Sequence, residues 1–208
     1  MTELSAEAWA AFQREDWAAA EKIFREILST PALIQDESRQ AWYGLGSVLA
    51  CAEQFAEARE IFASLGQRAA ARGDPAFEHV ALHQLGMVER LAGNWAAAQQ
   101  CFEHEREMIA RLGNSDLAVA VNAYELGTVA QHLGEQAEAK VWLDLSLARA
   151  ERTDDLIAVG CAHRGLGDWL SAQGQEEEAR RRWQAAHASF LRARDEKAAF
   201  DIGRRLHS

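Results

Sequence analysis

The chain has few of the residues that interrupt helices. It contains only two prolines, Pro31 and Pro75, among 208 residues, whereas alanine accounts for 42. Because alanine is the strongest helix former and proline the weakest, this composition predicts an all-helical protein. Hydrophobic residues make up 49% of the chain. That share is enough to bury a sizeable core, and it excludes a chain that is intrinsically disordered throughout.

Cysteine is scarce, basic charge is in deficit and long apolar runs are missing. The three cysteines, Cys51, Cys101 and Cys161, lie far apart and form no Cys-x-x-Cys pair, so we expect neither a disulfide framework nor a zinc knuckle. A formal net charge of -10 disfavours a nucleic-acid partner. No apolar run reaches the roughly 18 residues that span a bilayer, and no basic-then-apolar secretory signal opens the chain. We therefore expect a soluble, cytoplasmic protein with no membrane partner.

Two sequence markers recur with a period of about 40 residues. The dipeptide Leu-Gly is repeated at steps of 40, 41 and 40, and an alanine followed four residues later by a large apolar residue is repeated at steps of 38, 40, 41 and 40. Self-similarity at a fixed period is the signature of a repeat architecture. The first marker stands at Leu45-Gly46, Leu85-Gly86, Leu126-Gly127 and Leu166-Gly167, and the second at Ala20/Phe24, Ala58/Phe62, Ala98/Phe102, Ala139/Leu143 and Ala179/Trp183.

Turn residues divide each period into two helices. Glycines stand eight residues after three of the marker leucines, at Gly93, Gly134 and Gly174, and are typical of left-handed helix ends. Residues such as Asp74 and Ser115 can cap the next helix, and Pro75 suits a first helical turn. The predicted helices cover 3–14, 17–29, 37–52, 55–71, 75–92, 95–111, 115–133, 136–151, 155–173, 176–193 and 195–206.

The markers have a packing role in this interpretation. A glycine lacks a Cβ atom, so the second helix of a hairpin can approach the first closely, and the large residue is expected to fill the gap against the next hairpin. A single hairpin cannot bury such a face, so we expect about five hairpins stacked as one domain over 1–208. The last helix, with Asp201, Arg204, Arg205 and His207, is interpreted as a solvating cap. The expected repeats cover 3–30, 37–72, 75–112, 115–152 and 155–193, and the cap covers 195–206.

These markers resemble those of tetratricopeptide repeat (TPR) proteins, over nearly the whole chain. The pattern W-x2-L-G-x2-Y…A-x3-F is matched best by Trp42, Leu45-Gly46 and Leu49, followed by Ala58 and Phe62. The period exceeds the usual 34 residues, and is similar to the longer repeats of bacterial peptide-sensing regulators and kinesin light chains. The resemblance implies an all-α superhelix, a TPR solenoid, in which the first helix of each hairpin (helix A) lines a concave ligand-binding surface.

One face of the A helices is the candidate binding surface. Its positions lie two before, two after and five after each marker leucine, with a residue one turn earlier, and this spacing puts them on one helix face. The face lacks Lys and Glu and is rich in Tyr, His and Arg, which are favoured in recognition surfaces. We expect it to prefer an acidic segment or a C-terminal carboxylate. This helix-A stripe consists of Arg39, Tyr43, Ser47, His79, His83, Met87, Arg90, Tyr124, Thr128, Gln131, Arg164 and Asp168.

Two more specific kinds of site have little support in the sequence. His79 and His83 share the i, i+4 spacing of metal-binding helices, and His132 or His163 could join them, but no carboxylate or cysteine stands at a matching position, so no metal site is expected. No glycine-rich phosphate loop, G-x-S-x-G elbow or Cys–His pair with an orienting acid is present. We therefore expect neither an enzyme nor a cofactor.

The sequence thus predicts a non-catalytic scaffold that binds a protein or peptide through the helix-A stripe. Several alternatives stay open. The stripe could be a solvated face or could be covered by a neighbouring chain. The protein could instead be a peptide-responsive sensor that acts on an effector protein through a change of superhelix shape. A homo-oligomer that uses Trp9, Trp17 and Trp95 is compatible with each of these functions.

Overall fold

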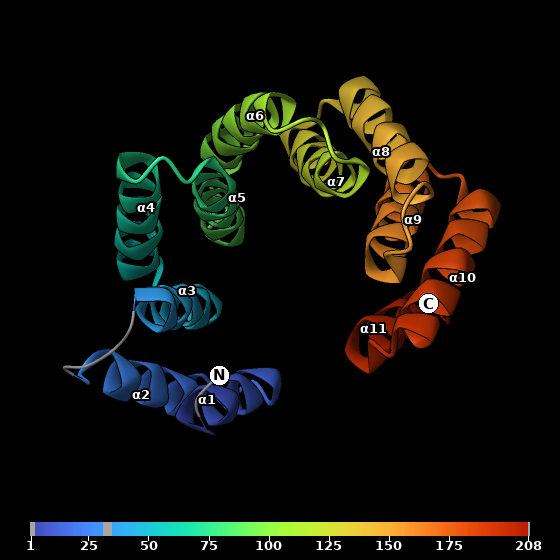
Figure 1. Cartoon of the computed structure of the whole chain (residues 1–208). Helices are drawn as coiled ribbons and strands as arrows, with labels where there is room; N and C mark the ends of the chain where they lie inside the picture. The colour runs from blue at the N-terminus through green and yellow to red at the C-terminus, as the bar shows by residue number, and fades with distance from the viewer. Residues whose placement is uncertain (1–2, 31–34, 208) are drawn as a thin grey trace. The chain divides into compact units, whose positions relative to one another are not determined.

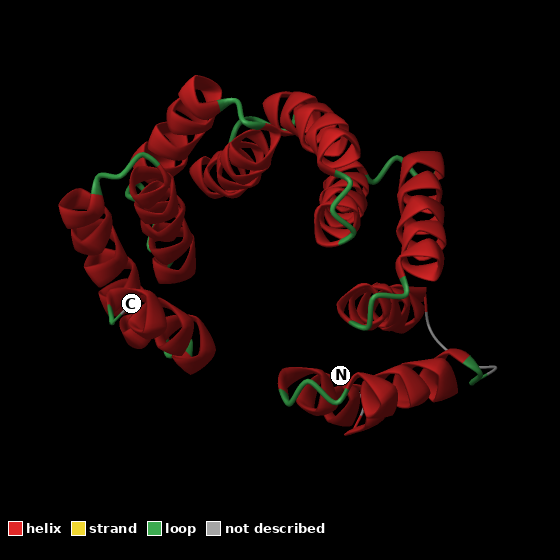
Figure 2. Cartoon of the chain, turned by 180° about the vertical axis from the view of Figure 1, so that it is seen from behind, coloured by secondary structure: helices red, strands yellow, loops and turns green. Residues whose placement is uncertain are grey.

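The computed structural model describes residues 3–30 and 35–207, and every regular element in this part of the chain is an α-helix (Figure 2). Pro31 lies outside the described residues. Each predicted helix is found, with ends that differ from the prediction by no more than two residues, so the all-α repeat architecture is confirmed. In chain order (Figure 1) they are α1 (Glu3–Gln13), α2 (Trp17–Leu28), α3 (Gln35–Cys51), α4 (Phe55–Ala71), α5 (Pro75–Leu91), α6 (Trp95–Arg111), α7 (Asp116–Leu133), α8 (Gln136–Ala150), α9 (Leu156–Ala172), α10 (Glu176–Ala193) and α11 (Glu196–Leu206).

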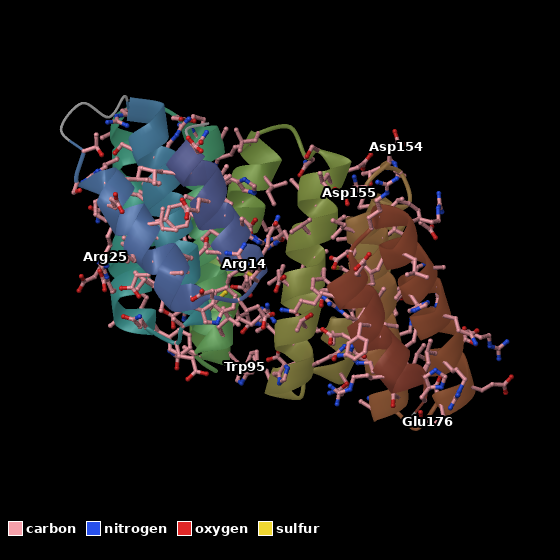
Figure 3. The ribbon with its side chains drawn as sticks, turned by 90° about the horizontal axis from the view of Figure 1, so that it is seen from below. Arg14, Arg25, Trp95, Asp154, Asp155 and Glu176 are labelled. Carbon is pink, nitrogen blue, oxygen red and sulfur yellow. The ribbon has the colours of Figure 1, made fainter. Side chains whose placement is uncertain are left out.

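Side-chain caps and left-handed residues set the helix boundaries, as the sequence predicts. The Asp74 carboxylate accepts a hydrogen bond from the Phe77 backbone N–H at 3.1 Å, and Asp155 accepts one from Ala158 at 2.8 Å. Five glycines in the turns have φ between 64° and 98°, a conformation that only glycine adopts without strain. In unit 2, defined next, Asp154 and Asp155 lie at one end and Glu176 at the other (Figure 3), because the chain reverses direction at every turn.

The chain forms two compact units, Met1–Cys101 (unit 1) and Phe102–Ser208 (unit 2), and the division falls within α6. None of the helices in the described parts of the chain combines the length and the apolar character needed to cross a membrane.

Aromatic rings hold the two helices of the first hairpin of unit 1 together. The Trp9 ring lies 5.4 Å from that of Phe24, and the Phe12 ring lies 5.2 Å from that of Trp17, both edge to face. The two tryptophans are half-buried against the core of the unit, where Phe24 is fully buried. Trp9 and Trp17 therefore contribute much of their apolar surface to the core of unit 1, and little of it is left for the oligomer interface considered above.

The glycines of the Leu-Gly markers give the second helix of each hairpin room to approach. A Cβ atom added at Gly46 would lie 2.8 Å from the Phe62 ring in unit 1, and one added at Gly167 would lie 2.5 Å from the Trp183 ring in unit 2. Real Cβ contacts are not this short, so the large marker residue fits only because the glycine has no side chain. The predicted close approach of the two helices is confirmed at these positions, but Phe62 and Trp183 lie against the glycine of their own hairpin as well as being expected to face the next one.

Candidate partner-binding surface

In unit 1 the structure assigns Arg39 to an internal ion pair. Its Nη1 lies 2.9 Å from Asp74 Oδ2, and its guanidinium stacks 4.5 Å from the centre of the Phe77 ring. Asp74 also caps α5. Arg39 therefore ties α3 to the start of α5, and its place in the binding surface stays a prediction.

Tyr43 and Ser47, one turn apart on α3, are also partly engaged within unit 1. The Tyr43 ring lies 6.4 Å from Trp9 and 5.9 Å from Phe62, and burial raises the pKa of its hydroxyl. The Ser47 hydroxyl donates a hydrogen bond to the Tyr43 carbonyl at 3.0 Å. Both residues remain half-buried, so they can contribute a limited area to a binding surface.

The α5 part of the stripe keeps its helical register. His79, His83, Met87 and Arg90 are all half-buried, and their spacing places them along one side of α5. Among the described residues, no three His, Cys, Asp or Glu side chains gather closely enough to hold a metal ion.

In unit 2 the structure brings Tyr124 and Arg164 together from α7 and α9. The Arg164 guanidinium donates to the Tyr124 hydroxyl from Nη2 at 2.6 Å and from Nε at 3.2 Å, and it lies 5.4 Å from the centre of the same ring. Its centre is also 5.8 Å from the Phe190 ring. Burial alone would lower the pKa of Arg164, but Tyr124 and Cys161 raise it above its ordinary value. Arg164 is thus a fixed and permanent cation.

Thr128 and Gln131 continue the stripe along α7. The Thr128 hydroxyl donates to the Tyr124 carbonyl at 2.9 Å, and Gln131 Nε2 donates to the Gly165 carbonyl on α9 at 3.3 Å. Gln131 therefore joins two A helices of unit 2, while the Thr128 hydrogen bond stays within α7.

Asp168 on α9 is held by two partners. Its Oδ1 accepts a hydrogen bond from Trp183 Nε1 at 2.8 Å and lies 3.2 Å from Arg205 Nε on α11. Burial raises the pKa of this carboxyl, although Arg205 and Trp183 oppose that shift. Asp168 therefore neutralises Arg205 in part and positions its guanidinium.

Four charged residues of unit 2 line a hollow of about 420 Å³. We call it the arginine hollow, and its residues are Arg164, Asp201, Arg204 and Arg205. Arg204 is exposed and forms no recorded ion pair among the described residues, so it is available to a ligand. The hollow concentrates cationic groups on a chain whose net charge is -10.

Two contacts of α11 are additional to the solvating cap predicted for this helix. Arg205 is half-buried in its pair with Asp168, and Arg204 faces the same hollow as Arg164. A signal for this arrangement was present in the sequence, because Arg204 follows Arg164 by one period of 40 residues. The last helix therefore continues the helix-A stripe.

Comparisons with known proteins agree with this architecture. A tetratricopeptide repeat family model matches residues 77–152, whereas a comparison with curated proteins finds no significant match. The crystal structure of BtubC (BKLC) from P. vanneervenii is similar with a TM-score of 0.70 and 17% identity, over 92% of this chain and 80% of that one. TPR-like repeats attributed to a kinesin light chain of Podosopora anserina give a TM-score of 0.64 at 17% identity, over 91% and 94% of the two chains.

A third similar structure is that of a Rap protein complexed with Competence and Sporulation Factor. Its TM-score is 0.68 at 14% identity, and the match covers 98% of this chain but 61% of the Rap chain. At such identities the likeness concerns the fold alone. The family model covers residues 77–152, and the 40-residue markers and the helical hairpins continue the same TPR-like architecture on either side of that segment.

Proposed function

We propose that this protein is a non-catalytic scaffold that binds a protein or peptide segment along the helix-A stripe of unit 2. Stacked helical repeats present extended surfaces of this kind. The arginine hollow is the observation that carries the proposal, because it places three guanidinium groups at one end of that stripe. In this function the hollow receives a carboxylate, either an acidic side chain or the C-terminus of the partner.

The chemistry of the hollow suits a carboxylate. Three arginines oppose Asp201 within the hollow and Asp168 beside it, which leaves a local charge of +1 (3 − 2). A guanidinium binds a carboxylate through two parallel hydrogen bonds, which are stronger than bonds between neutral groups. Arg164 is already fixed by Tyr124, so it loses little side-chain entropy when the partner binds.

The site of action we propose is the cytoplasm. No disulfide joins Cys51, Cys101 and Cys161, and unlinked cysteines are typical of proteins in reducing compartments.

A peptide-display library with free C-termini tests the binding function. The bait is the wild-type chain, compared with the double variant Arg164→Gln/Arg204→Gln. The matched control is Arg181→Gln on α10, whose guanidinium is exposed and pairs with Glu177 at 3.2 Å, outside the hollow. We expect wild type and control to enrich the same acidic or carboxylate-ended sequences and the double variant to lose them. Enrichment that is unchanged by the double variant, or that shows no acidic preference, contradicts the proposal.

A peptide-responsive sensor is the second candidate function. The similar fold of the Rap protein, whose structure contains Competence and Sporulation Factor, supports it. A sensor changes shape when its peptide binds, whereas a scaffold keeps its shape. Small-angle scattering of the chain with and without a display-selected peptide distinguishes the two, because only a sensor shows a change in the radius of gyration.

A further inference from the structure

One face of α11 is uncovered. Glu196, Phe200, Gly203 and His207 follow one another at i, i+4, i+7 and i+11, so they form a single stripe along the helix. Phe200 is 68% exposed, more than any other large hydrophobic residue recorded for the described chain. The adjacent face, with Ala199 and Ile202, is buried against the rest of unit 2.

The repeat register shows what normally covers this face. The residues 40 positions earlier, on α9, face α10, the second helix of the same hairpin. A Cβ atom at Gly160 would lie 2.7 Å from the Phe190 ring, and one at Gly167 would lie 2.5 Å from the Trp183 ring. Phe200 and His207 are the α11 equivalents of these two glycines. The stripe on α11 therefore has the position of a surface that a second helix covers.

No helix among the described residues takes that place beside α11. A hollow of about 500 Å³ lies there instead, lined by His187, Ala199, Phe200, Gly203, Arg204 and His207. A Cβ atom added at Gly203 would meet only His187 Nε2, at 3.9 Å. Beside the exposed Phe200 ring there is thus an open space large enough for an aromatic side chain.

The stripe is complementary to a second copy of itself. Two α11 helices can pack antiparallel about a two-fold axis. In the register in which the numbers of two facing residues sum to 403, each Phe200 lies opposite the partner's Gly203. The same pairing sets Glu196 opposite the partner's His207, so a carboxylate faces an imidazole that can donate a hydrogen bond to it. A two-fold interface requires this kind of self-complementarity in shape and charge, and the helices of each hairpin in the fold also run antiparallel.

We propose that unit 2 pairs with a second copy of this chain through α11, and that the partner's α11 packs on the exposed stripe, where the repeat register places a second helix. The phenyl ring of each copy inserts into the space beside Gly203 of the other. Because one helix of 11 residues buries less than a standard interface, the dimer is a weak one whose population depends on protein concentration.

Sedimentation equilibrium over a concentration series measures this association. Phe200→Glu removes the inserted ring and places two carboxylates at the interface, so we expect the dissociation constant to rise at least about tenfold. The matched control is Val141→Glu, because Val141 is 64% exposed on α8 and lies outside the stripe. This control is expected to leave the dissociation constant unchanged.

A residue exchange keeps the test independent of folding defects. Gly203→Phe fills the space beside residue 203 and should weaken the dimer. The double variant Phe200→Ala/Gly203→Phe moves the aromatic ring to position 203 and opens the space at position 200, so it should restore association. Circular dichroism checks that each variant stays helical. A wild-type chain that stays monomeric at about 1 mM, a Phe200→Glu variant that still pairs, or an exchange variant that does not recover overturns the proposal. Peptide binding at the arginine hollow is assayed on monomer at low concentration, so the two proposals fail independently.

Discussion

Replacing Gly167 by alanine tests the packing role of the Leu-Gly marker. Gly167 lies in the middle of α9, and a Cβ atom there would come within 2.5 Å of Cδ1 and Nε1 of Trp183. The Trp183 ring cannot easily move, because its Nε1 donates to Asp168 at 2.8 Å and its side chain is 9% exposed. The substitution therefore forces either the tryptophan or the whole of α10 to shift.

The expected magnitude follows from three contributions. Overpacking a core with one methyl group costs about 2 kcal/mol. Weakening the hydrogen bond from Trp183 to Asp168 costs about 1 kcal/mol. The higher helix propensity of alanine returns about 1 kcal/mol. We expect Gly167→Ala to lower the free energy of unfolding of unit 2 by about 2 kcal/mol, as these three figures sum.

Gly66→Ala is the matched control, since Gly66 lies within α4 and its added Cβ atom would contact only the Ala81 Cβ, at an ordinary 3.6 Å. This control should gain stability by about 0.5–1 kcal/mol from helix propensity. Urea unfolding gives the overall change, and amide hydrogen exchange of α9 and α10 locates it, because repeat proteins open locally. If Gly167→Ala stabilises the protein as Gly66→Ala does, the packing explanation is wrong.

Three further substitutions test the interior of unit 2. Burial and a nearby arginine lower the pKa of His163. The contribution of the neutral imidazole to the free energy of unfolding is therefore complete above the unfolded pKa of about 6.5 and declines as the pH falls below it. His163→Gln should reduce the loss of unfolding free energy that urea unfolding measures between pH 7.5 and 5. Asn122 donates to the buried Glu105 carboxylate at 2.9 Å, so Asn122→Ala should cost about 1–3 kcal/mol in the same assay. Tyr124→Phe removes the hydroxyl that accepts hydrogen bonds from Arg164. We expect it to lower the unfolding free energy by about 1.5 kcal/mol and to weaken the binding of a display-selected acidic peptide several-fold. An unchanged peptide affinity would show that binding does not need this anchoring of Arg164.

The features that the sequence predicted correctly depend on local chemistry or on the repeat period. Asp74 caps a helix through a hydrogen bond to a residue three positions away, and a glycine such as Gly134 ends one through its own backbone conformation. The close packing of Gly167 against Trp183 follows from the common register of the two markers. None of these inferences requires knowledge of how distant side chains orient.

The sequence did not reveal contacts between residues far apart in the chain. The stripe register includes Arg39, but it does not specify that this side chain reaches Asp74, 35 residues away, and forms an ion pair. The pairing of Arg205 with Asp168 likewise depends on how α11 packs on its neighbours, which a pattern of exposed charges does not specify. Arg204 was missed for a different reason: the 40-residue register reaches Leu206 in the last helix, but the stripe position two residues before each marker leucine was not applied there.

The most direct test of the binding function is a nuclear magnetic resonance titration of the arginine side chains with a display-selected acidic peptide. The Nε–Hε signals of Arg164 and Arg204 report on the hollow, and that of Arg181, which pairs with Glu177 on α10, reports on a surface outside it. We expect the first two signals to shift with one common dissociation constant, while the Arg181 signal stays in place and the amidated, charge-neutral form of the peptide has no effect. Shifts confined to Arg181, or equal shifts with both forms of the peptide, would contradict carboxylate recognition at the arginine hollow.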